Sequence, residues 1–183
     1  MRFDGILFDL DGTLWDSCLS VAESWRNTLY TRYGVQHLPS VEDIQSIMGL
    51  PTSEVARRLF TGYGAPAQEV CSTCMRDECR YLAQHGGVLY PGVPEMLASL
   101  AEQAPLFIVS NCQSGYIELF LKKTDLGSFI TDFECAGNTG HPKGYNIRLV
   151  ADRNHLEHPV YVGDIDGDRV ASEKAGVPFC HAS

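Results

Sequence analysis

The amino-acid sequence predicts an α/β protein: a doubly wound, Rossmann-like parallel sheet with an inserted all-helical domain. Two observations carry this prediction. Short apolar runs alternate with helical patterns at the start of the chain and again from about residue 91, which is typical of a parallel sheet. Between these parts, residues 16–85 show helical patterns only. We therefore expect a core domain of residues 1–15 and 86–183, and a helical domain of residues 16–85.

The first strand is predicted from the apolar run at residues 6–8, and it delivers two carboxylates. Asp9 and Asp11 follow it, before a turn at Gly12. Open α/β sheets place their ligand sites at the carboxyl ends of strands. Two like charges this close are unfavourable unless a cation lies between them or one is protonated. Mg²⁺ meets this need, and one carboxylate then acts as nucleophile while its neighbour transfers protons.

The inserted segment contains four helical patterns. Asp16 or Ser17 is expected to cap the first, which should end near Gly34. Short helices are predicted at residues 40–48 and 53–60, and a longer one from Pro66 to residues 86–87.

Several side chains in and near this segment have either a structural or a functional interpretation. The helical spacing of Cys71 and Cys79 with apolar neighbours favours core thiols over a metal cluster that includes Cys74. Arg57 and Arg58 are expected on a solvated helix face rather than at a second anionic group of a ligand. The turn at residues 47–51 is a candidate substrate-facing loop, whereas Trp15 and Tyr116 are expected to be packing residues.

The α/β alternation resumes after Pro91. Strands are predicted at residues 106–109, 133–136, 160–162 and 177–180, and helices at 94–103, 115–123, after Lys143 and at 169–175, with Met96, Leu97 and Leu100 facing inward. Ser110 and Asn111 follow one strand and Asp164 follows another. Because parallel strands end at one edge of the sheet, these polar groups should converge with Asp9 and Asp11.

The bulk composition is that of a globular protein. Of 183 residues 44% are hydrophobic, and no apolar run approaches the ~20 residues of a membrane span. With 14 basic and 23 acidic residues the net charge is −9, which argues against binding to nucleic acid or to an anionic membrane. Seven cysteines without the spacing of a secreted scaffold predict reduced thiols and a cytoplasmic protein.

Four motifs together resemble those of the haloacid dehalogenase-like hydrolases, most of which are phosphatases. They are Asp9-x-Asp11-Gly12-Thr13, Ser110-Asn111, Lys143 and Gly163-Asp164-x-x-x-Asp168. Gly144 departs from the proline that many members have after the lysine. A calcium-binding loop does not fit the last motif, because Arg169 and Ala175 stand where that loop requires glycine and glutamate. The resemblance covers essentially the whole chain and is to the branch of phosphoglycolate phosphatases and β-phosphoglucomutases with a helical cap.

The resemblance implies a role for each motif residue. Asp9 is the expected nucleophile, Asp11 the acid–base and Lys143 the group that offsets charge. The other expected roles are phosphate binding by Thr13, Ser110 and Asn111, and Mg²⁺ binding by Asp9, the Asp11 backbone carbonyl and Asp164. Asp168 is expected to orient Lys143 or metal-bound water, and Asp166 to be a solvated turn acid or an outer-shell group. Members usually continue beyond the strand at 177–180, so an edge strand and a closing helix are expected to be absent.

The resemblance predicts a Mg²⁺-dependent phosphatase that hydrolyses a small-molecule phosphomonoester through an aspartyl-phosphate. A β-phosphoglucomutase-like phosphoryl transferase is the first alternative. A non-catalytic regulatory or binding protein is the second, and the intact motif residues count against it. A dehalogenase is disfavoured because that branch lacks an equivalent of Asp11. The expected partner is a small phosphorylated metabolite, and the expected state is a monomer or weak homodimer.

Overall fold

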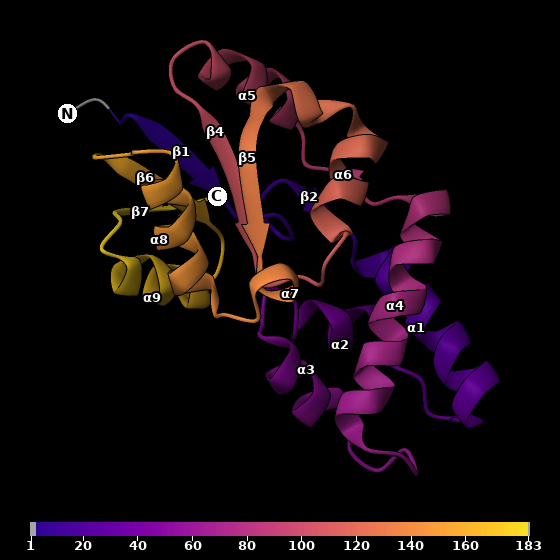
Figure 1. Cartoon of the computed structure of the whole chain (residues 1–183). Helices are drawn as coiled ribbons and strands as arrows, with labels where there is room; N and C mark the ends of the chain where they lie inside the picture. The colour runs from indigo at the N-terminus through magenta and orange to yellow at the C-terminus, as the bar shows by residue number, and fades with distance from the viewer. Residues whose placement is uncertain (1–2, 183) are drawn as a thin grey trace.

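The computed structural model describes residues 3–182. Within them, five parallel strands form one sheet in the order β5-β4-β1-β6-β7. The strands are β1 (Gly5–Phe8), β4 (Leu106–Ser110), β5 (Ile130–Cys135), β6 (Pro159–Gly163) and β7 (Phe179–His181). β1 occupies the centre of the sheet, so the chain crosses over on both sides of it (Figure 1). The predicted doubly wound α/β fold is therefore confirmed.

Helices cover both faces of the sheet, and strand residues alternate between two apolar clusters. Leu7 packs in a cluster with α8 (Lys143–Arg153) and α9 (Asp166–Ala175). Phe8 packs on the other face with α5 (Val93–Ala101) and α6 (Tyr116–Thr124). Because successive strand side chains point to opposite faces, a strand covered on both must be apolar throughout. The burial of every residue of β4 follows from this position. The short η1 (Leu126–Phe129) and α7 (Ala136–Thr139) flank β5.

Several details differ from the sequence prediction. The strand expected at residues 133–136 is β5, which begins at Ile130, and the strand expected at residues 177–180 is β7, which begins at Phe179. The last helix begins at Asp166 rather than Arg169, because the Asp168 carboxylate accepts the Ile165 N–H at 3.3 Å and stabilises an earlier start. Met96 was expected to face inward but is 37% exposed. The buried stripe of α5 runs through Val93 and Leu97, and Met96 falls at the edge of that stripe.

Residues 18–85, called the helical block from here on, lie beside one end of the sheet (Figure 1). The block consists of α1 (Cys18–Tyr33), α2 (Val41–Gln45), α3 (Thr52–Leu59) and α4 (Ala67–His85). An antiparallel pair, β2 (Trp15–Asp16) and β3 (Val88–Leu89), joins the two ends of the block. Of the two expected caps of α1, Asp16 accepts the Cys18 N–H at 2.9 Å, whereas Ser17 makes no capping bond with its side chain.

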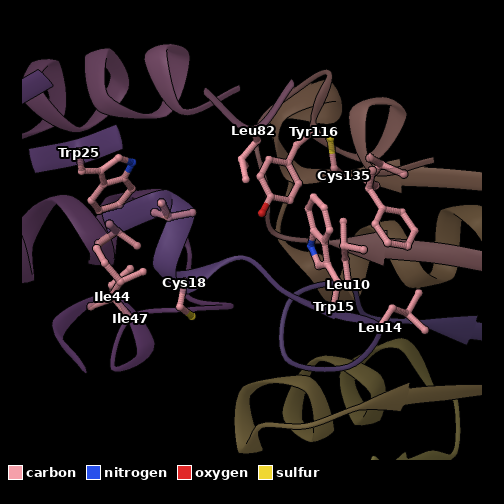
Figure 2. Close-up of a cluster of buried hydrophobic side chains, with 14 of the residues drawn as sticks. Leu10, Leu14, Trp15, Cys18, Trp25, Ile44, Ile47, Leu82, Tyr116 and Cys135 are labelled. Atoms are coloured by element: carbon pink, nitrogen blue, oxygen red, sulfur yellow. The ribbon is translucent and has the colours of Figure 1, made fainter. Parts of the chain in front are cut away.

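One apolar cluster runs without a break from the sheet into the helical block. Figure 2 shows Trp15 with Leu10 and Leu14 on the sheet side, Trp25 with Ile44 and Ile47 in the block, and Leu82 and Tyr116 between them. Cys71, predicted to be a core thiol, is fully buried in this cluster, and so is Cys74. Cys79, predicted to lie on the same stripe, is only partly buried and packs against the cluster, and none of the three forms a disulfide. Within residues 3–182, no helix combines the length and apolarity needed to cross a membrane.

Candidate active site

Three neighbouring strands end in polar residues at one edge of the sheet, called the carboxyl edge here. Asp9 follows β1, Ser110 ends β4 and Asp164 follows β6. β1 pairs in parallel with both β4 and β6, and the Asp9 N–H donates to the Val162 carbonyl at 2.8 Å. Groups that are far apart in the sequence therefore lie at one edge, where open α/β sheets bind ligands.

Lys143, at the start of α8, bridges two buried carboxylates. Its Nζ lies 2.9 Å from Asp9 Oδ1 and 2.5 Å from Asp168 Oδ1, and none of the three side chains is more than 3% exposed. Burial lowers the pKa of Lys143, but the two carboxylates outweigh it and hold this pKa above its usual range. The lysine therefore stays charged and compensates negative charge that could not otherwise be buried.

Asp164 is held at the same edge by Thr13 and Gly12. The Thr13 hydroxyl donates to Asp164 Oδ1 at 2.9 Å, so a residue predicted to bind phosphate contacts a predicted metal ligand here. Gly12 has a φ of 88°, and a Cβ at this position would lie 2.3 Å from Asp164 Oδ2. Both the backbone conformation and the close approach of the carboxylate therefore require glycine.

Asp11 is 8% exposed, and one of its oxygens accepts three hydrogen bonds. The donors to Oδ1 are Trp15 Nε1 at 3.0 Å, Ser17 Oγ at 2.8 Å and the Tyr116 hydroxyl at 2.8 Å. Trp15 and Tyr116 do pack, edge to face at 5.9 Å (Figure 2), but the sequence analysis missed that their polar atoms orient Asp11. The available signal was that buried tryptophan and tyrosine need partners for their N–H and O–H groups.

Burial raises the pKa of Asp9, Asp11 and Asp164 above the usual range of a carboxyl group. For Asp9 the charge of Lys143 opposes this effect, and for Asp11 the three hydrogen-bond donors oppose it. Asp9 is thus beside a fixed cation, whereas Asp11 has only neutral donors. The two carboxyl groups are therefore held in different electrostatic surroundings.

The carboxyl edge has the donor set of a divalent metal site. Asp9, Asp164 and Asp168 each offer one carboxylate oxygen, and these oxygens lie within 4.8 Å of one another. Lys143 is one positive charge against these three acids. Excess negative charge and oxygen ligands alone fit Mg²⁺. Asp168 is already engaged, however, because its Oδ1 binds Lys143 and its Oδ2 accepts the N–H groups of Asp164 and Ile165.

The loop after β4 connects the carboxyl edge to the helical block. Ser110 is buried at the end of the strand. The Asn111 side-chain amide donates to the Gly49 carbonyl at 2.8 Å, and Gln113 donates to Glu78 at 2.9 Å. Residues 47–50, four of the five in the predicted substrate-facing loop, line a cavity together with Asp11, Ser110 and Asn111.

Other charged residues that the sequence left open lie in solvent. Arg57 and Arg58 bind Glu54 at 2.6 and 2.7 Å and are 69% and 46% exposed. Asp166 is 91% exposed and pairs with Arg169. These side chains are arranged as solvated helix surfaces.

The chain belongs to the haloacid dehalogenase-like hydrolases, because the model of this family matches residues 6–182. It is therefore an enzyme of the hydrolase class.

Individual relatives narrow the comparison. The chain is 29% identical to a validoxylamine A 7'-phosphate phosphatase of Streptomyces hygroscopicus subsp. limoneus, over 95% of this chain and 82% of that one. It is 28% identical to a phosphoglycolate phosphatase of Rhodobacter capsulatus, over 95% and 81% of the two chains. A solved haloacid dehalogenase-like hydrolase of Streptococcus pneumoniae shares the fold, with a TM-score of 0.79 at 20% identity over 97% and 83% of the two chains.

Proposed function

We propose that this enzyme is a Mg²⁺-dependent phosphatase that hydrolyses a small-molecule phosphomonoester through an aspartyl-phosphate on Asp9. The observation that carries this proposal is the placement of two acids: Asp9 beside the charged Lys143, and Asp11 held by neutral donors beside a cavity. The phosphatase activities named for the two curated relatives support it.

The chain's own residues suffice to describe the two chemical steps. An Asp9 carboxylate oxygen attacks phosphorus, the phosphorus–oxygen ester bond breaks, and Asp11 gives its proton to the leaving alkoxide. Asp11 then removes a proton from water, whose oxygen attacks the aspartyl-phosphate. Inorganic phosphate leaves and Asp9 is regenerated. Lys143 stays charged throughout and offsets the negative charge on Asp9 and the phosphoryl oxygens.

Magnesium would be held by the carboxylates of Asp9 and Asp164 and by the backbone carbonyl of Asp11. When bound, it would stabilise the charge that develops on the phosphoryl oxygens. Ser110, Asn111 and Thr13 remain the proposed phosphate contacts. Asn111 would serve both the phosphate and the Gly49 carbonyl that it already contacts.

We also propose that residues 16–85 are a cap domain over the active site. The contacts of Asn111 and Gln113 with the helical block, and the cavity between them, support this role, because such a lid excludes water and surrounds the leaving group. The cytoplasm remains the proposed location, supported by free thiols at all seven cysteines. The proposed partner is a small phosphorylated metabolite.

The test is hydrolysis of p-nitrophenyl phosphate with Mg²⁺ and with EDTA, combined with intact-protein mass spectrometry after a rapid acid quench. We expect a phosphoryl adduct on the wild type, and a loss of kcat of more than about 10³-fold for Asp9→Asn. The matched control is Asp166→Asn, an exposed acid near the same edge, which should retain wild-type turnover. Full activity in EDTA, or an Asp9→Asn variant as active as the control, would overturn the proposal.

A further inference from the structure

A cavity between the helical block and the carboxyl edge begins at Asp11. Its empty volume, which includes space open to solvent, is ≈ 460 Å³, and the loop after β4 forms one wall. The wall on the side of the helical block is mainly apolar, with Val21, Trp25, Met48, Leu50, Val55 and Met75. Asp11, the proposed acid, lines this cavity together with Ser110 and Asn111, the proposed phosphate contacts, so this cavity is where the leaving alcohol would lie.

One carboxyl group interrupts the apolar wall. Glu78, on α4, is 4% exposed. Its Oε2 accepts the Trp25 indole N–H at 2.6 Å, and its Oε1 accepts the Gln113 amide at 2.9 Å. Both partners are neutral, so the group has hydrogen bonds but no counter-charge. Burial raises the pKa of Glu78 to about 8, as expected for an acid in an apolar cavity.

Positive charge is absent from the described residues around this cavity. None of those that line it is lysine, arginine or histidine. The same holds for a second cavity on the other side of Asp11, between Asp16, Gln45 and Tyr90. The cation of the carboxyl edge, Lys143, is already bound by two acids.

These surroundings discriminate by charge. A leaving alcohol that carries a carboxylate would have to bury it beside the acids Glu78 and Asp11, with no basic side chain among the residues that line the cavity, which is unfavourable. Burial keeps Glu78 protonated in the free protein. An ammonium group of a ligand would favour the ionised form, so Glu78 would release its proton and form a charge-assisted hydrogen bond with the ammonium. A neutral hydroxyl would meet hydrogen-bonding groups but gain no charge pairing.

We propose that Glu78, positioned by Trp25 and Gln113, selects phosphomonoesters whose alcohol carries an amine and rejects those whose alcohol carries a carboxylate. This inference rests on the proposed phosphatase function. It assigns the substrate to phosphomonoesters whose alcohol is cationic. The nucleophile and its metal site do not distinguish between alcohols of different charge.

The test compares matched alkyl phosphates. Their ethyl, propyl or butyl chains end in an amine, a hydroxyl or a carboxylate. For the wild type with Mg²⁺ at the best chain length, kcat/KM should fall from amine to hydroxyl to carboxylate, by at least about tenfold overall, which corresponds to about 1.4 kcal/mol. Glu78→Gln should lower the ratio of kcat/KM for the amine ester to kcat/KM for the hydroxyl ester, because the cavity wall then has no ionisable group to pair with the amine. Glu69→Gln, an exposed glutamate on the same helix, should preserve the wild-type ratios.

A second measurement needs no variant and no ester turnover. Binding of the free amino alcohols and hydroxy acids to the wild type is followed by thermal shift, and the amino alcohols should bind more tightly. If the enzyme hydrolyses p-nitrophenyl phosphate but kcat/KM is equal for the amine, hydroxyl and carboxylate esters, the charge selection is overturned. The phosphatase function would still stand in that case. Absence of all phosphatase activity would instead refute the proposed function, and equal binding of the free alcohols would then refute the selection independently.

Discussion

The carboxyl edge and the cavity wall both contain buried acids. The acids of the carboxyl edge are paired with a cation, whereas the acid of the cavity wall is not. At the carboxyl edge, the ammonium of Lys143 compensates Asp9 and Asp168 at 2.9 and 2.5 Å. In the cavity wall, Glu78 has only the neutral Trp25 and Gln113 as partners. Carboxylates that are paired with a lysine have their charge compensated within the protein. An acid without such a partner favours a ligand that carries a positive charge.

Removal of the compensating charge should have the largest effect. Lys143→Met leaves Asp9 and Asp168 buried without a cation, so the free energy of unfolding should fall by about 3–5 kcal/mol without divalent metal. Urea denaturation in EDTA measures this change. Lys122→Met, at an exposed position, is the control. Equal stability of the two variants would show that the buried ion cluster contributes little.

The uncompensated acid should appear in the pH dependence of stability. The unfolded chain releases the Glu78 proton near pH 4.5, whereas the folded protein keeps it to about pH 8. Because the folded state binds more protons in this window, this group makes the free energy of unfolding fall as pH rises, by at most about 1.4 kcal/mol per pH unit. Glu78→Gln should remove that slope, so its stability relative to the wild type should rise between pH 5 and 7.

Denaturation of both proteins at several pH values measures the difference. Asp11 also acts electrostatically on Glu78 and further raises its pKa. The thiols of Cys71, Cys74 and Cys79 have raised pKa values and remain neutral across this range. A constant stability difference between wild type and variant would contradict a proton held by Glu78.

Close packing at the carboxyl edge can be tested with two glycines. Gly12 and Gly64 both have positive φ, but a Cβ at Gly12 would overlap Asp164 whereas a Cβ at Gly64 would meet nothing within 4 Å. Both alanine variants carry backbone strain. Gly12→Ala should lose about 1–3 kcal/mol more stability than Gly64→Ala and should bind Mg²⁺ less tightly. Thermal denaturation and metal titration provide the readouts, and equal losses would argue against the overlap.

The hydrogen bonds to Asp11 should give the smallest effect. Tyr116→Phe removes one of three donors, worth about 0.5–1.5 kcal/mol, so kcat should fall at most about tenfold. If Tyr116 positions Asp11 as the acid, the loss should be greater for alkyl phosphates than for p-nitrophenyl phosphate, whose leaving group needs little protonation. Tyr30→Phe is the exposed control. Equal losses for both ester types would indicate a structural role only.

The strands and the motif acids were predictable because local sequence determines them. The apolar runs at residues 6–8, 106–109 and 160–162 required burial on both faces, and this fixed the edge at which Asp9, Ser110 and Asp164 emerge. The donors to Asp11 were not predictable in this way. Tyr116 is 105 residues away from Asp11 in the sequence. The helical periodicity around Tyr116 predicts that the side chain is buried, but it does not predict the partner of the hydroxyl.

Glu78 is an unusual residue for its position in the sequence. It occupies a position between Cys71 and Leu82 on the buried stripe of α4, where an acid is unexpected and therefore informative. Its partner Gln113 comes from a different domain of the predicted division, so no local pattern connects the two. Pairs of this kind depend on how the helical block meets the sheet, which the sequence alone does not specify.

The glycines at the carboxyl edge have a consequence for the choice of substrate. A Cβ at Gly12 or at Gly163 would lie 2.3 or 2.5 Å from a carboxylate oxygen, so this edge has no room for one added methyl group. The cavity wall comes largely from the helical block, whose side chains can be exchanged without touching those glycines. On the proposed function, substitutions in the cavity wall are therefore expected to change the choice of substrate without altering the carboxyl edge, where an added side chain has no room.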